Sequence, residues 1–173
     1  SSTEADVVIT EIGGTTGDIE SQPFLEAIRQ VGLEQGKENC CFIHVVLVPY
    51  ISGSDEYKSK PAQHSVKELQ GMGVSPDIII LRADGSVGSD IRRKISTFCN
   101  VKPECVIENL TMPSLYQCPL MLHTGGLDDV VVKQLHLDVP HPHQDLHYRP
   151  RGQVRQAARC LSVGHGEPLS RRL

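Results

Sequence analysis

Acidic residues alternate with glycines directly after the first apolar run of the chain. Residues 11–21 read Glu-Ile-Gly-Gly-Thr-Thr-Gly-Asp-Ile-Glu-Ser. Glycine lets a backbone approach a ligand closely, and Glu11, Asp18 and Glu20 carry the hard oxygen atoms that suit Mg²⁺ or the ribose and base edges of a nucleotide. Acids near a helix N-terminus are also favoured by the helix dipole. The pattern alone therefore fits a ligand site and an ordinary strand-to-helix turn equally well.

A second polar cluster, residues 52–65, follows the next apolar run and contains Lys58 and Lys60. Lysines in a loop at the carboxyl edge of a sheet suit phosphate oxygens, although solvated surface lysines explain this loop, taken alone, slightly better. His44 lies inside the apolar run itself. We expect it to be a core histidine with a satisfied ring nitrogen rather than a catalytic base.

The elements that position these clusters alternate along the chain. Short apolar, β-branched runs predict strands, and apolar residues at helical spacing predict helices. The predicted strands cover residues 6–11, 41–50, 77–82 and 105–110. The predicted helices run from about Pro23 to Gly32 or Gly36, and over residues 63–72, 90–98 and 127–137, whereas residues 113–122 are ambiguous.

The helical spacing also predicts which side chains face the core. These are Phe24, Ile28, Val31, Val66, Leu69, Ile91, Ile95, Phe98, Val131 and Leu135. Alternating strands and helices indicate an α/β fold, with an open, mainly parallel sheet and helices on both faces. Because crossovers between parallel strands are right-handed, the acidic-glycine loop and the Lys58/Lys60 loop should meet at one edge of the sheet.

The distribution of charge divides the chain into two parts. Residues 1–140 hold 11 Lys/Arg against 19 Asp/Glu, whereas residues 141–173 hold 6 Arg against 2 acids. The acidic body and the aromatic content of 4% argue against nucleic-acid binding. Residues 1–140 are predicted to form the domain, and residues 141–173 an atypical basic tail, poorly ordered and outside the core.

The sequence also allows a prediction of the cellular compartment in which the protein is found. Neither a membrane span nor a secretory leader is visible. The six cysteines form no Cys-x-x-Cys spacing and are expected to stay reduced. A cytoplasmic protein without membrane partners is predicted.

Five separate blocks of the sequence resemble the synthetase (amidoligase) domain of CTP synthase, the UTP–ammonia ligase. They are residues 11–30, 44–50, 58–69, 76–80 and 94–101, and the resemblance runs without gaps from about Ala5 to about Val139. It implies a P-loop NTPase-like fold of the dethiobiotin-synthetase-like kind. It also implies ATP-dependent amination of UTP to CTP with glutamine-derived ammonia, through 4-phosphoryl-UTP, with Mg²⁺ as cofactor, CTP as feedback inhibitor and a homotetramer as the full-length assembly.

The resemblance assigns roles to individual residues. Glu11 matches a magnesium-binding glutamate, and Lys60 is expected to act in catalysis as well as in binding. The residues that match nucleotide-binding positions, for UTP or CTP, are Asp18, Ile19, Glu20, Lys58, Ser59, Lys60, Pro61, Ala62, Gln63 and Lys94. Ser59 and Ala62 stand where threonines are frequent in the family, which puts any hydroxyl contact there in doubt.

Several parts of the family pattern are not present in these residues. There is no GxxxxGK[ST] sequence, no second magnesium-binding acid, and no glutaminase Cys, His and Glu triad. The chain is therefore expected to be a middle piece of the enzyme and inactive alone. Two alternatives remain open at this point: another P-loop-type ligase resembling dethiobiotin synthetase, and a nucleotide-sensing or assembly module without catalysis.

Overall fold

A parallel sheet organises the computed structural model, which describes residues 7–139 and 160–164. Its five strands are β1 (Val8–Ile12), β2 (Cys40–Leu47), β5 (Ile78–Ala83), β6 (Val106–Leu110) and β7 (Cys160–Gly164). They lie in the order β1-β7-β2-β5-β6, and every neighbouring pair is parallel. The predicted strands are thus confirmed to within a few residues. The apolar, β-branched sequences of the central strands β2 and β5 fit burial on both faces.

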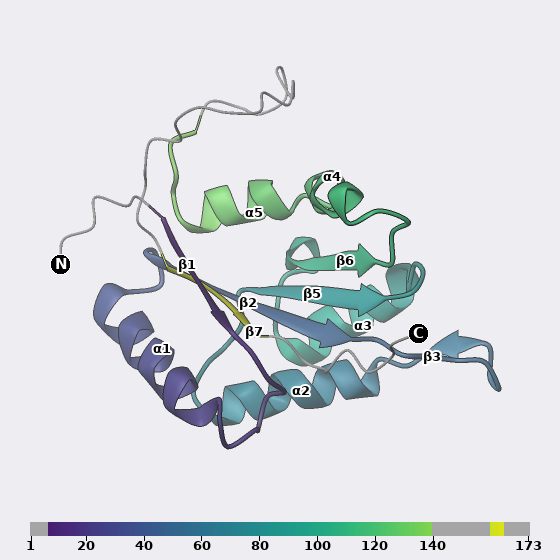
Figure 1. Cartoon of the computed structure of the whole chain (residues 1–173), viewed down its shortest axis with the longest axis horizontal. Coiled ribbons are helices and arrows are strands. Elements are labelled where there is room, and N and C mark those ends of the chain that lie inside the picture. The colour runs from purple at the N-terminus through teal and green to yellow at the C-terminus, as the bar shows by residue number, and fades with distance from the viewer. Residues whose placement is uncertain (1–6, 140–159, 165–173) are drawn as a thin grey trace.

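Helices cover both faces of this sheet (Figure 1). On β5, Ile79 and Leu81 point toward α2 (Lys60–Gly71) and α3 (Gly88–Cys99). The alternate residues Ile78 and Ile80 pack on the side of α4 (Cys118–Thr124) and α5 (Leu127–Gln134). This alternation is the two-residue period of a strand, and it confirms the predicted α/β architecture.

Helix α1 (Gln22–Gln35) packs beside α2 through a face that includes Ile28, as predicted, but not Phe24. Leu25 and Ile28 are buried as part of a cluster with Ile12 of β1, whereas Phe24 is 62% exposed. Gly32 continues the buried stripe, because a Cβ on Gly32 would lie only 2.8 Å from the Phe42 ring. The helix approaches β2 most closely at this glycine, and that contact turns Phe24 outward.

The apolar stripe of α3 also differs from the prediction at one position. Ile95 is fully buried as expected, but Phe98 is 68% exposed and Cys99 takes its place in the core. Residues four apart lie on one face of a helix, so a stripe through Ile91 and Ile95 continues to Cys99. Helix α2 begins at Lys60 rather than at residue 63, with Pro61 in its first turn.

The remaining elements are short. A hairpin of β3 (Tyr50–Ile51) and β4 (Glu56–Tyr57) follows β2, and 3₁₀ turns occupy Pro103–Cys105 and Leu115–Gln117. Residues 113–122, which were ambiguous in sequence, thus hold the second 3₁₀ turn and the start of α4. None of the described helices has both the length and the apolar character needed to cross a bilayer.

Strand β7 lies within residues 141–173, which were predicted to form a tail outside the core. Residues 160–164 pair in parallel with β1 on one side and β2 on the other. A run of five residues is too short to reveal a period in sequence, but backbone pairing with two neighbours suffices to place it. Residues 140–159 and 165–173 lie outside the described part, so the domain boundary at residue 140 stays a prediction.

Candidate functional site

The acidic-glycine loop leaves the end of β1 and rests on α2. Asp18 closes the loop on itself, because one carboxylate oxygen accepts a hydrogen bond from the Thr15 backbone N–H at 2.9 Å. Gly17 has φ +100°, and a Cβ there would lie 2.2 Å from a Glu68 carboxylate oxygen on α2. Only glycine adopts this backbone without strain. The loop conformation therefore depends on Gly17 and on the surface of α2 below it.

Glu11, Asp18, Ile19 and Glu20 are all exposed in this loop. Exposed carboxylates keep their hydration and are available to an incoming ligand. Magnesium is commonly held by one or two protein carboxylates together with phosphate oxygens and waters, so Glu11 fits as a single ligand. No group of three or more potential metal ligands gathers anywhere in residues 7–139 or in β7. A magnesium ion at Glu11 would therefore need most of its oxygens from nucleotide and water.

The β3–β4 hairpin positions the first of the predicted lysines. The Lys58 backbone N–H donates to the Pro49 carbonyl at 3.0 Å, which ties the hairpin to the end of β2. The Lys58 ammonium forms an ion pair with the carboxylate of Glu56. Glu56 was not among the site residues predicted from the sequence. A carboxylate two residues before a lysine in an extended segment places both side chains on one face, and this spacing predicts an ion pair.

Helix α2 begins at Lys60, after the N-cap residue Ser59, and residues 59–63 of the matched segment form its start. Lys60 and Pro61 are exposed there, whereas Ser59 is 6% exposed and Ala62 has no exposed surface. Gln63 donates from its amide to the Ser59 hydroxyl at 3.0 Å. The side chains of Ser59 and Ala62 thus pack inside the protein, and Lys58 and Lys60 are the charged groups left for a ligand.

Lys94 lies on α3, which packs against α2 through Val66 and Ile95. Hydrogen bonds from Lys58 and then Ser54 hold the pKa of the Glu56 carboxyl below its usual range, and the charge of Lys94 adds a smaller effect in the same direction. The fold thus places Lys94 on the helix that packs against α2, although 36 positions separate it from Lys58 in the sequence.

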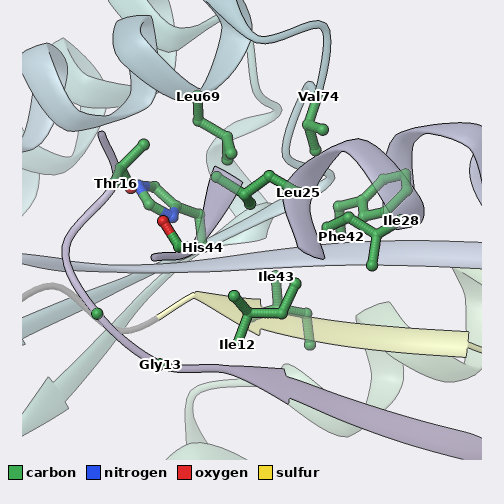
Figure 2. Close-up of a pocket in the computed structure, with 12 residues that line it drawn as sticks. Ile12, Gly13, Thr16, Leu25, Ile28, Phe42, Ile43, His44, Leu69 and Val74 are labelled. Carbon is green, nitrogen blue, oxygen red and sulfur yellow. The ribbon is translucent and has the colours of Figure 1, made fainter. Parts of the chain in front are cut away.

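A small apolar cavity lies on the other side of α2, between the acidic-glycine loop, α1 and β2 (Figure 2). Its volume of about 20 Å³ suits one water molecule rather than a nucleotide. His44 lines this cavity and shares a hydrogen bond of 2.9 Å between its Nε2 and the Ser65 hydroxyl. Burial lowers the pKa of His44 to about 4, so the ring is neutral at pH 7. The predicted core histidine is confirmed.

The acidic-glycine loop and the lysines do not share this cavity. It is lined by Gly13, Gly14 and Thr16 but by none of Lys58, Lys60 and Lys94. Gly17 rests on Glu68, which lies eight positions after Lys60 on α2, or about 12 Å along a helix axis. Strand β7 also separates β1 from β2. The two charged groups therefore lie at different places on α2. We call them the acidic half-site (residues 11–21) and the basic half-site (Lys58 and Lys60).

The amino-acid sequence matches the family model described as "CTP synthase N-terminus" over residues 1–137. It is 57% identical over 134 residues to a CTP synthase of Clostridium beijerinckii, covering 78% of this chain and 25% of that protein. A CTP synthase of Clostridium kluyveri is 59% identical over 132 residues, or 76% and 25% of the two chains. One of Staphylococcus haemolyticus is 52% identical over 143 residues, or 83% and 27%. The chain spans about a quarter of the length of these curated relatives.

Proposed function

The chain belongs to the CTP synthase family, and from this premise we propose that its α/β body supplies the pyrimidine-nucleotide site of an enzyme that converts UTP to CTP. One observation carries the proposal: Lys58 and Lys60 flank the start of α2, and Lys94 lies on α3, which packs against α2. A group of lysines at a helix N-terminus, where backbone N–H groups are also unsatisfied, suits a triphosphate.

Different residues of this chain are assigned to different parts of the ligands. Lys58, Lys60 and Lys94 hold the phosphates of UTP or CTP, and the exposed segment Asp18–Glu20 contacts the pyrimidine nucleotide. Lys60 also stabilises the charge that develops when the phosphoryl group of ATP moves to O4 of UTP, before ammonia from glutamine displaces it at C4. Magnesium, bound with Glu11 as one ligand, would neutralise phosphate charge. We include in this proposal a P-loop NTPase-like sheet, related to dethiobiotin synthetase.

The separation of the two half-sites supports a site shared between subunits. Within one chain, the acidic-glycine loop docks on α2 about 12 Å from Lys60. In a homotetramer, the lysines of one subunit and the segment Asp18–Glu20 of the next can face the same nucleotide. This arrangement explains why each half-site is solvent-exposed in the single chain.

We do not expect the 173-residue polypeptide to form CTP on its own. Its sequence contains no GxxxxGK[ST] loop to cradle the phosphates of ATP. The purified chain, incubated with UTP, ATP, Mg²⁺ and ammonium, should release no CTP. Formation of CTP under these conditions would show that other residues cradle the phosphates of ATP.

Nucleotide binding by the purified chain tests the proposal, with Lys60→Ala as the variant and Lys67→Ala as the matched control. Lys67 is an exposed lysine on the same helix, two turns beyond Lys60. A charge-assisted hydrogen bond contributes about 1.5–3 kcal/mol, so Lys60→Ala should weaken UTP and CTP binding by roughly 10- to 100-fold in calorimetry. Lys67→Ala should leave it unchanged. Equal affinities in all three proteins would remove Lys60 from the site.

The relatives favour this function over a ligase resembling dethiobiotin synthetase, because all the curated relatives described above are CTP synthases. Ligand preference separates the two possibilities. UTP or CTP should raise the melting temperature of the chain, and diaminopelargonate should not. A melting temperature raised by diaminopelargonate but not by UTP or CTP would favour a ligase resembling dethiobiotin synthetase.

A module that senses nucleotide without catalysis is the other alternative. It would gain support if CTP bound normally while Glu11→Ala changed neither magnesium-dependent nucleotide affinity nor any activity of the full-length enzyme.

A further inference from the structure

Lys58, a lysine proposed to bind phosphate, is already paired with the carboxylate of Glu56. Glu56 lies on β4 opposite Ile51 of β3, and its carboxylate accepts a hydrogen bond from the Lys58 ammonium. This acid of the hairpin is therefore paired with one of the lysines assigned to the nucleotide.

The hairpin that carries Glu56 is anchored to the body of the protein. Tyr57, the residue between Glu56 and Lys58, packs edge-on against Tyr50 with 5.2 Å between the ring centroids. It also contacts the main core, and its hydroxyl is 2.9 Å from the position that a Cβ on Gly85 would take. Tyr57 is therefore fixed in place, and its two neighbours in the sequence, Glu56 and Lys58, are held in position with it.

We propose that Glu56 is an intramolecular competitor for phosphate, which holds Lys58 while the site is empty and releases it when a triphosphate binds. The inference rests on the proposed function, in which these lysines bind the nucleotide phosphates. A carboxylate carries one negative charge, whereas a terminal monophosphate carries about 1.5–2 and a triphosphate carries more. Competition and repulsion by Glu56 thus penalise every phosphate ligand, and the larger attraction of a triphosphate to Lys58 and Lys94 overcomes this penalty most easily.

The cost of displacing Glu56 falls on every ligand that takes Lys58. A nucleoside monophosphate, which makes fewer contacts to the lysines, therefore loses no more binding free energy to Glu56 than a triphosphate does.

Calorimetric titration of the full 173-residue chain at low salt tests this role with Glu56→Gln and the control Asp55→Asn. Asp55 lies on the same hairpin, but its carboxylate accepts a hydrogen bond from the Tyr50 hydroxyl, which an asparagine oxygen can also accept. The probes are inorganic tripolyphosphate, UTP and UMP. Because the variant neither competes for Lys58 nor repels phosphate, Glu56→Gln should bind tripolyphosphate and UTP roughly three- to tenfold more tightly.

Asp55→Asn should give less than half of that gain in binding free energy, and the gain for UMP in Glu56→Gln should be smaller than the gain for UTP. Adding Lys58→Ala to Glu56→Gln should abolish the gain. Weaker binding by Glu56→Gln, an equal gain from Asp55→Asn, or no tripolyphosphate binding by Glu56→Gln would each overturn the inference. If tripolyphosphate binding tightens while UTP binds no better than tripolyphosphate in any variant, the role of Glu56 stands and the proposed pyrimidine recognition fails.

Discussion

The buried, neutral state of His44 makes the stability of the protein depend on pH in a predictable way. The pKa of this side chain falls from 6.5 to about 4 on folding because burial disfavours the charged ring. The unfolded chain therefore binds a proton at a higher pH than the folded chain does. The contribution of His44 to stability is complete above pH 6.5 and is lost progressively as the pH falls from 6.5 toward 4.

The size of the effect follows from linkage. A difference of about 2.5 pKa units corresponds to about 3 kcal/mol in total, of which about 2 kcal/mol should be lost between pH 7.5 and pH 5. Urea unfolding at pH 7.5, 6 and 5 measures this loss. Other groups titrate in the same range, so the informative quantity is the difference in unfolding free energy between the native chain and His44→Gln, which should shrink by about 2 kcal/mol over this range.

A matched control is available on α2. His64 is an exposed histidine, so His64→Gln should follow the pH profile of the native chain. Glutamine at position 44 does not titrate, although it can still contact the Ser65 hydroxyl. Parallel pH profiles for the native chain and His44→Gln would show that His44 titrates alike in the folded and unfolded states, and would refute the argument from burial.

Two further contrasts test the packing that differs from the sequence prediction. Ile95→Ala should destabilise the protein by about 2–5 kcal/mol because the side chain is fully buried, whereas Phe98→Ala on the same helix should change stability by no more than about 0.5 kcal/mol because it is 68% exposed. Gly32→Ala should cost about 1–3 kcal/mol, since the new methyl group would lie 2.8 Å from the Phe42 ring, and Phe42→Leu should recover part of that loss in the double variant. Urea denaturation measures each value, and equal effects of Ile95→Ala and Phe98→Ala would contradict the orientation of α3.

The strands and the fold class were predictable because they depend on local patterns. Runs such as residues 78–81 are apolar without interruption, which few structures other than a sheet covered on both faces accommodate. The helices were located correctly for the same reason, and predicted core residues such as Ile28, Val66 and Ile95 are buried. Phe24 and Phe98 both satisfy a helical period, yet both are exposed, because the contacts of Gly32 and Cys99 set the rotation of each helix.

The sequence by itself determined the chemistry of the candidate site: carboxylates and glycines after β1, lysines around the start of α2, and a match to the CTP synthase family over residues 1–137. Those are properties of residue type and order. Only the tertiary structure decided that Ser59 and Ala62 face inward, and that the acidic-glycine loop rests on α2 near Glu68. Such placements depend on helix rotation, on the docking of the hairpin through Tyr57, and on the insertion of β7 between β1 and β2. Each of these is a contact between distant segments, which no local pattern encodes.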